Sequence, residues 1–267
     1  MELYERNLAL LIRYDGTNYH GWQSQKNGTT VQEVLSDAIL RLTGLPPQPE
    51  LHGAGRTDAG VHAVNYVANF HTGTRIPSDR FPLAIRPFLP EDIAVLAAAD
   101  VKEDFHARYS CLEKTYCYRF YTARVPDPFL RNRAYFTPFR VDLDAMREGA
   151  AVLPGTHDFA AFRASNYTAK GSVRTVTRLT VEEESPEHFA ITVSADGFLY
   201  NMVRIIAGTL FYVGIGKLRP EDVRRILENG YRPDAGITLP PHGLYLLSAR
   251  YPAGTFEGGD EAFDPKI

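Results

Sequence analysis

A glycine-rich segment at residues 52–63, His-Gly-Ala-Gly-Arg-Thr-Asp-Ala-Gly-Val-His-Ala, is where residue types first suggest chemistry. Its glycines let main chain approach a ligand closely, and its tip carries Arg56, Thr57 and Asp58. The segment is not a phosphate-binding loop, because position 58 is not glycine and no Gly-Lys-Ser/Thr follows. Two interpretations of Asp58 stay open on these residues alone: a carboxylate that caps its own turn, or one that acts on a ligand.

Sequence patterns around this loop predict a strand and then a helix before it, and a further strand directly on each side of it. The apolar run at 8–14 is typical of a strand. Thr30 and Glu33 form a capping box for a helix that ends near Gly44. The flanking strands fall at 50–55 and 63–71. Further strands are predicted near 93–103, 114–124, 173–183, 188–195 and 243–250, and helices near 78–88, 142–153, 200–215 and 220–229.

This order of elements predicts an α+β fold. We expect two similar α/β halves joined by a central, mostly antiparallel sheet, with helices on one face and the active-site cleft on the other. Residues 1–106 form the N-terminal half with the glycine-rich loop, and residues 107–251 form the C-terminal half. Residues 252–267, rich in glycine and acidic side chains, are predicted to be a disordered tail.

Composition and residue spacing predict a cytoplasmic protein that neither binds a metal ion nor spans a membrane. The 267 residues include no apolar run of membrane-spanning length, and the N-terminus lacks a basic region followed by an apolar core. Cys111 and Cys117 lie in one extended segment, too far apart for a disulfide, so we expect reduced thiols. The histidines, among them His52, His62 and His106, lack ligand spacing and favour hydrogen bonding over metal binding.

Charge is unevenly distributed along the chain. The formal net charge is −3, yet residues 111–180 carry 11 Lys and Arg against 6 Asp and Glu, between two acidic flanks. Of the 29 cations 23 are arginine, whose planar guanidinium binds phosphate at two points. Charge alone is also consistent with an ordinary solvated, arginine-rich surface.

Five further motifs accompany the loop in order along the chain. They are Tyr14-Asp15-Gly16-Thr17-x-Tyr19-x-Gly21-Trp22-Gln23-x-Gln25, Phe105-His106-Ala107-Arg108, Lys114-Thr115-Tyr116-x-Tyr118-Arg119, His157-Asp158-Phe159-x-x-Phe162-Arg163 and Gly197-Phe198-Leu199-Tyr200-Asn201-Met202-Val203-Arg204. Together with the loop, they closely resemble the motifs of the tRNA pseudouridine synthase A family, from residue 8 to about 250. One such motif has little specificity, whereas five in the family's order are highly specific.

The resemblance implies a catalytic set of Asp58, Tyr116 and Arg204. Asp58 is the nucleophile in a reaction that breaks the C1′–N1 bond of uridine and forms a bond to C5. Attack on C1′, attack on C6 and removal of the 2′ proton all remain open. Tyr116 packs on the target base and takes part in proton handling at C5, although a strand tyrosine is also a natural core residue, as Tyr118 is. Arg204, otherwise interpreted as a helix-surface residue, pairs with Asp58 and keeps it ionised.

The resemblance also implies how RNA is bound. The substrate is tRNA, modified at positions 38, 39 and 40 of the anticodon stem-loop, and the target uridine must be extruded from its stack. Arg56 fills the vacated space, while Arg75, Phe105 and Arg124 contact RNA. The phosphate track is the basic segment, with Arg131, Arg133, Arg163, Lys170, Arg174 and Arg178. The family works as a homodimer in which each tRNA contacts both subunits. No cofactor is implied, since the isomerisation is redox-neutral and consumes no nucleotide.

Two other classes of function compete with this interpretation. A non-catalytic RNA-binding module would use exposed aromatic side chains for stacking but would not need Asp58. A glycoside or nucleoside hydrolase would need a second carboxylate, which the motifs do not offer. The apolar helix at 197–216 is consistent with either a core element or a dimer contact.

Overall fold

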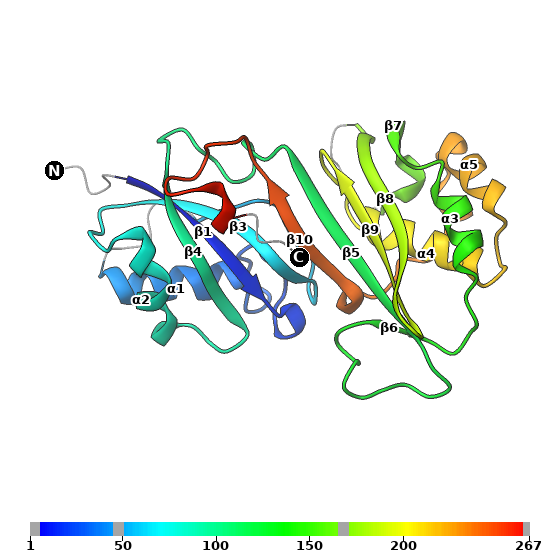
Figure 1. The fold of residues 1–267 in the computed structure, drawn as a ribbon, viewed down its shortest axis with the longest axis horizontal. Coiled ribbons are helices and arrows are strands. Elements are labelled where there is room, and N and C mark those ends of the chain that lie inside the picture. Colours follow the sequence, from blue (N-terminus) through cyan, green and yellow to red (C-terminus); the bar gives the residue numbers. More distant parts are fainter. Residues whose placement is uncertain (1–5, 45–50, 165–170, 264–267) are drawn as a thin grey trace. The chain divides into compact units, whose positions relative to one another are not determined.

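The structure, a computed structural model, describes residues 6–44, 51–164 and 171–263 in two compact units (Figure 1). The first unit comprises Met1–Leu112 with Leu246–Ile267, and the second is Glu113–Tyr245. The expected halves meet at residues 106 and 107 and keep the chain in the second half to residue 251. In the structure the chain returns to the first unit at Leu246, within a strand (Leu244–Arg250) that lies beside an N-terminal strand.

The sheet of the first unit has β1 (Arg6–Tyr14) between β3 (His62–Thr72) and β4 (Ile93–Val101), both antiparallel to it. On the far side of β3 lies β10 (Leu244–Arg250). The short β2 (His52–Gly53) also pairs with β3. Residues 8–12 of β1 are fully buried, as expected for an apolar run covered on both faces.

Helix α1 (Val31–Thr43) follows the predicted capping pattern. The Thr30 hydroxyl accepts from the Glu33 N–H at 3.4 Å, and the helix ends at Gly44, whose φ of +67° is left-handed. The helix predicted at 78–88 is α2 (Phe81–Ile85) between two 3-10 turns, η2 (Ser78–Arg80) and η3 (Arg86–Phe88). Pro82 and Pro87 account for the two breaks, because neither has an N–H to donate to the carbonyl four residues earlier.

The second unit contains a sheet in the order β5 (Glu113–Thr122), β9 (His188–Ala195), β8 (Val173–Ser185) and β7 (Gly155–Asp158), with neighbours antiparallel. The short β6 (Tyr135–Thr137) runs parallel to β5. Strands β6 and β7 were not predicted, since three or four residues are too few to show a period. The α+β class with mostly antiparallel pairing is confirmed.

Three helices pack together in this unit: α3 (Leu143–Ala150), α4 (Met202–Gly214) and α5 (Pro220–Asn229). Helix α3 contacts both others and β8, as Figure 1 shows. Ile205, Ile206 and Leu210 of α4 are 0% exposed, so this apolar helix is a core element of the unit. The remaining 3-10 turns are η1 (Gly16–Asn18), η4 (Ala160–Phe162), η5 (Arg232–Asp234), η6 (Pro241–Gly243) and η7 (Asp260–Ala262).

The expectation of a disordered tail is wrong for residues 252–263, while 264–267 lie outside the described residues. Phe256 and Phe263 are 6% and 5% exposed and stack with ring centroids 3.9 Å apart. Phe256 also packs against Phe105 and Tyr251 of the same unit. Two buried aromatic rings outweigh the glycine-rich, acidic composition on which that expectation rested. Among the helices of the described residues, none has the length and apolar character needed to span a membrane.

Candidate functional site

The loop at 52–63 rests on three buried aromatic rings, those of Tyr14, Trp22 and Tyr66. Trp22 and Tyr66 stack with centroids 4.1 Å apart, and Tyr14 lies 5.7 Å from Tyr66. The Tyr66 hydroxyl donates to the Gly55 carbonyl. The Tyr14 hydroxyl lies 2.8 Å from the Thr57 hydroxyl in a buried hydrogen bond. The residues on either side of Arg56 are therefore tied to a rigid aromatic base.

Main-chain hydrogen bonds fix the second half of the loop. The Trp22 N–H donates to the Thr57 carbonyl and the Gly60 N–H to the Tyr19 carbonyl, both at 3.2 Å. The Val61 N–H donates to the Asp58 carbonyl at 3.2 Å and closes a turn in which Gly60 has a φ of +79°. Asp58 is half-buried at the start of this turn, whereas Arg56 is exposed.

Two glycines of the Tyr14–Gln25 motif allow this close approach. A Cβ on Gly16 would lie 1.9 Å from the Val61 carbonyl oxygen, and one on Gly21 would lie 2.2 Å from the Thr57 carbonyl oxygen. Both contacts are with main chain, which has no flexible side chain to move aside. The motif is thus the surface on which the loop docks, a role that its sequence alone did not reveal.

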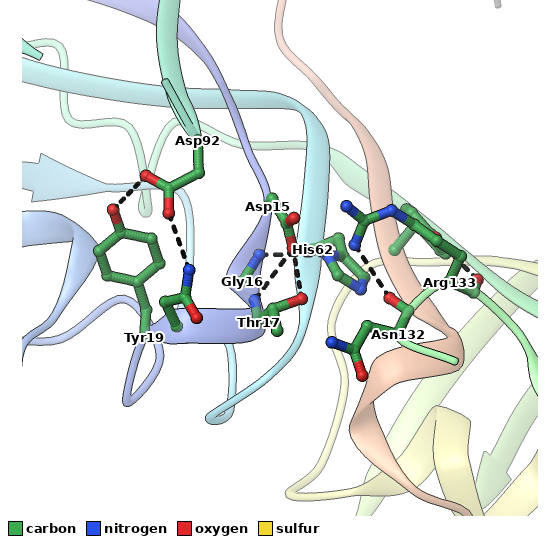
Figure 2. A network of polar contacts seen from close by, with 10 residues as sticks. Asp15, Gly16, Thr17, Tyr19, His62, Asp92, Asn132 and Arg133 are labelled. Carbon is green, nitrogen blue, oxygen red and sulfur yellow. Dashed lines mark hydrogen bonds and ion pairs between the residues drawn. The ribbon is translucent and has the colours of Figure 1, made fainter. Parts of the chain in front are cut away.

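A polar network ties the end of the loop to the exit of β1 (Figure 2). His62 is 3% exposed, and its Nδ1 lies 3.0 Å from Asp15 Oδ1 and 3.1 Å from the Gly16 nitrogen. One ring nitrogen serves one of these partners at a time: protonated, it donates to the carboxylate, and deprotonated, it accepts from the Gly16 N–H. Asp15 also accepts from the N–H and hydroxyl of Thr17. His62 therefore binds loop and strand together in either state.

Tyr19 extends this network to the start of β4. Its hydroxyl donates to Asp92, and the Asp15 N–H donates to the Asp92 carbonyl at 2.9 Å. Burial, together with the Asp92 carboxylate, raises the pKa of Tyr19 well above its usual value. The tyrosine thus remains a neutral donor at physiological pH.

In the second unit, Tyr116 lies on β5 opposite Val193 of β9 and is 8% exposed. Its ring meets the edge of the Phe198 ring at 5.0 Å. Tyr118, two residues on, is 0% exposed, and its hydroxyl donates to the Pro240 carbonyl at 2.7 Å. Burial raises the pKa of Tyr118 well above normal, and the positive charge of Arg204 opposes this rise. Tyr118 is the core residue that the sequence suggested, and Tyr116 is nearly as buried.

Arg204 is anchored at the first turn of α4. Its Nε donates to the Leu239 carbonyl and its Nη1 to the Asn201 side chain, both at 2.7 Å. Its own carbonyl accepts from the Leu239 N–H at 3.3 Å. Asn201, the residue before the helix, has a left-handed φ of +60°. The guanidinium is thus held in a fixed place, which a helix-surface arginine is not.

The predicted RNA-binding residues divide into two groups. Arg56, Arg75 and Arg124 are exposed on loops, where they can meet a ligand. Phe105 is 8% exposed and packs against Tyr251 at 5.4 Å. The ring thus packs in the core of the first unit, and the contact of Phe105 with RNA stays a prediction.

Fold and site together define a class: an α+β protein that presents a carboxylate on a rigidly held loop and carries exposed arginines suited to a phosphate-rich ligand. The family model described as tRNA pseudouridine synthase matches residues 10–110 and 150–252. The tRNA pseudouridine synthases A of Thermoanaerobacter sp. (strain X514) and Acetivibrio thermocellus are each 48% identical to the chain over 246 residues, covering 92% of it and 100% of each relative. That of Caldicellulosiruptor bescii is 47% identical over 248 residues, covering 92% of the chain and 100% of that relative.

Among solved structures, a crystal structure of a Cbf5-Nop10-Gar1 complex aligns at 14% identity with a TM-score of 0.34, over 77% of this chain and 45% of that one. From the family model and the sequence relatives, the chain belongs to the tRNA pseudouridine synthase family. It is an isomerase that acts on uridine in tRNA.

Proposed function

We propose that the chain converts uridine to pseudouridine at positions 38, 39 and 40 of the tRNA anticodon stem-loop, with Asp58 as the nucleophile. The observation that carries this proposal is the immobilisation of the loop at 52–63 on Tyr14, Trp22 and Tyr66. A nucleophile reacts fastest when it is held in its reacting position before substrate arrives, because no free energy is then needed to order it during the reaction.

The reaction needs a group that holds one fragment while the C1′–N1 bond is broken and C5 is brought to C1′. A carboxylate on Asp58 can attack C1′, attack C6 or remove the 2′ proton. We propose that Arg204 keeps this carboxylate ionised, because a fixed cation favours the charged form of a carboxyl group in a site that excludes water. Two hydrogen bonds that hold its guanidinium in place support the assignment. Tyr116 packs on the base and takes part in proton handling at C5.

Substrate binding requires the target uridine to leave its stack, at a cost of a few kcal/mol. Arg56, exposed two residues before Asp58, is proposed to fill the space that the base vacates. Arg75 and Arg124 contact phosphates, and the basic segment at 111–180 continues their track. We further propose that the protein is cytoplasmic and works as a homodimer, with each tRNA contacting both subunits.

The test is release of tritium from 5-tritiated uridine in unmodified tRNA, with wild type, Asp58→Asn and Asp79→Asn compared. Asp79 is an exposed aspartate of η2, so Asp79→Asn controls for loss of one carboxylate charge. We expect wild type and Asp79→Asn to release tritium, and Asp58→Asn to bind tRNA without releasing any.

No release from wild type would overturn the proposed activity. Release by Asp58→Asn at the control rate would leave the activity in place and remove Asp58 as the nucleophile. Substrates in which uridines 38, 39 and 40 are replaced one at a time by cytidine test the choice of position.

A further inference from the structure

A pocket of about 480 Å³ lies in the second unit, where β5 and β6 end. The segment at 123–134, named here the arginine loop, forms one wall through Asp127 and Arg131. Tyr121, Tyr135, Phe136 and His242 form others. All of these residues except His242 lie between the two stretches that the family model matches. Nothing in the catalytic assignment uses this pocket.

The walls of the pocket are held in place by hydrogen bonds from the same unit. The Asp127 N–H donates to the Tyr121 hydroxyl at 3.1 Å, and Asp127 Oδ1 accepts from the Phe129 N–H at 2.8 Å. The Tyr245 hydroxyl donates to the Arg133 carbonyl at 2.7 Å and secures the far end of the arginine loop. The Tyr121 and Phe136 rings lie 5.4 Å apart. The pocket is therefore formed before any ligand binds.

The lining combines aromatic faces with cationic and neutral polar groups. Three aromatic rings and two prolines supply flat apolar surface, on which a nucleobase stacks without regard to its identity. The exposed guanidinium of Arg131 suits a phosphate. Burial, and then the charge of Arg204, lower the pKa of His242, which adds a polar aromatic ring to the lining.

Size and charge favour a nucleotide over a protein side chain as the occupant. Ligand pockets commonly have volumes of about 300–1,000 Å³, and this one is large enough for a single nucleotide. The arginine loop carries Arg124, Arg131 and Arg133 against the single acid Asp127, so its charge complements RNA. A base inside a duplex does not present its faces, which leaves an unpaired nucleotide.

We propose that this pocket binds one unpaired nucleotide of the tRNA substrate, separate from the uridine that is modified. The base stacks among Tyr121, Tyr135 and Phe136, and its phosphate lies on Arg131. This inference rests on the proposed function for its substrate, but it concerns binding and needs no turnover. The pocket then selects tRNAs by a nucleotide that the chemistry does not touch.

The first experiment is photocrosslinking of the wild-type chain to tRNAs that carry 5-iodouridine at one unpaired position at a time. We expect one position to crosslink to a peptide within residues 121–136. Because the wild-type chain is used, the result does not depend on a variant that folds. Crosslinks confined to other peptides would overturn the proposal.

The second experiment measures tRNA affinity for Arg131→Ala and Phe136→Leu, with Arg224→Ala as a matched loss of one exposed arginine in the same unit. We expect Kd to rise about tenfold for the two pocket variants and to change little for the control. A tRNA abasic at the crosslinked position should bind wild type as weakly as Phe136→Leu binds intact tRNA, and Phe136→Leu should not weaken it further.

Equal affinities for Arg131→Ala and Arg224→Ala, or additive losses on the abasic tRNA, would refute the assignment. Sedimentation velocity without RNA supplies the last comparison. A pocket variant that changes subunit association, with affinity following association, would show that a second copy of the chain occupies the pocket. Neither measurement needs tritium release, so failure of the proposed activity and failure of this pocket are distinguishable.

Discussion

Replacing Gly21 by alanine should displace the loop at 52–63 by a calculable amount. The added Cβ would lie 2.2 Å from the Thr57 carbonyl oxygen, and an ordinary contact begins near 3.4 Å. One of the two main-chain segments must therefore move by about 1.2 Å, next to the residue that carries the proposed nucleophile. A misplacement of about 1 Å at a reacting group costs on the order of 100-fold in rate. Since Gly21 has a φ of +84°, alanine also adds about 1–2 kcal/mol of left-handed strain.

Alanine substitutions at two other glycines separate the effect of displacing the loop from the effect of left-handed backbone strain. Gly44 has a φ of +67°, and a Cβ added there would meet no atom of the described residues within 4 Å, so Gly44→Ala carries the strain alone. Gly16 has no left-handed φ, but its Cβ would lie 1.9 Å from the Val61 carbonyl oxygen, so Gly16→Ala carries the displacement alone. We expect Gly16→Ala and Gly21→Ala to lose about 100-fold in kcat, and Gly44→Ala to lose about 1 kcal/mol of stability with wild-type kcat.

The assay is tritium release at saturating tRNA, with circular dichroism to confirm folding. A folded Gly21→Ala with the kcat of Gly44→Ala would refute the argument that loop position limits the reaction. If neither loop variant folds, Tyr14→Phe replaces them, because it removes the hydroxyl that bonds to Thr57 without adding an atom. A kcat for Tyr14→Phe equal to that of wild type would refute the same argument.

Three further predictions follow from the structure. Burial raises the pKa of Cys117 to about 11 from 9.0. The neutral thiol therefore stabilises the fold fully below about pH 9, and this contribution is lost as the pH rises to 11. The urea midpoint of wild type should fall relative to that of Cys117→Val between these two pH values, and a constant difference would contradict the prediction. Phe256→Ala should lower the free energy of unfolding by about 3 kcal/mol, whereas Phe129→Ala, at a residue 90% exposed, should change it little; equal effects in thermal melts would remove the anchoring role of the tail. The logarithm of the tRNA association constant should fall with the logarithm of salt concentration with a slope of about −5 if six basic residues meet phosphates, and a flat response would count against the phosphate track.

Local patterns in the sequence determined several elements correctly. The Thr30 and Glu33 capping box and Gly44 marked both ends of α1, because capping depends on residues only three or four positions apart. The apolar run at 8–14 predicted β1, because such a run is also a local signal within the sequence. Prediction failed where the sequence pattern is short or interrupted. Strands β6 and β7 are too brief to show an alternation of apolar and polar residues, and Pro87 interrupts the expected helix at 78–88.

Other features were decided only by tertiary packing. Phe105 stands in a motif that resembles an RNA contact, yet Tyr251 and Phe256, more than 140 residues away, bury its ring. Those same partners hold residues 252–263 against the first unit, against the composition of that segment.

The loop at 52–63 shows both kinds of information. Its residues alone identified Asp58 as a carboxylate between glycines, and the resemblance of its motif suggested the chemistry. What keeps that loop rigid is the packing of Tyr14 and Trp22, from before it, on Tyr66, from after it. Such contacts depend on distances in space, which no spacing along the chain encodes, so the sequence identified the proposed nucleophile and the tertiary structure decided how firmly its loop is held.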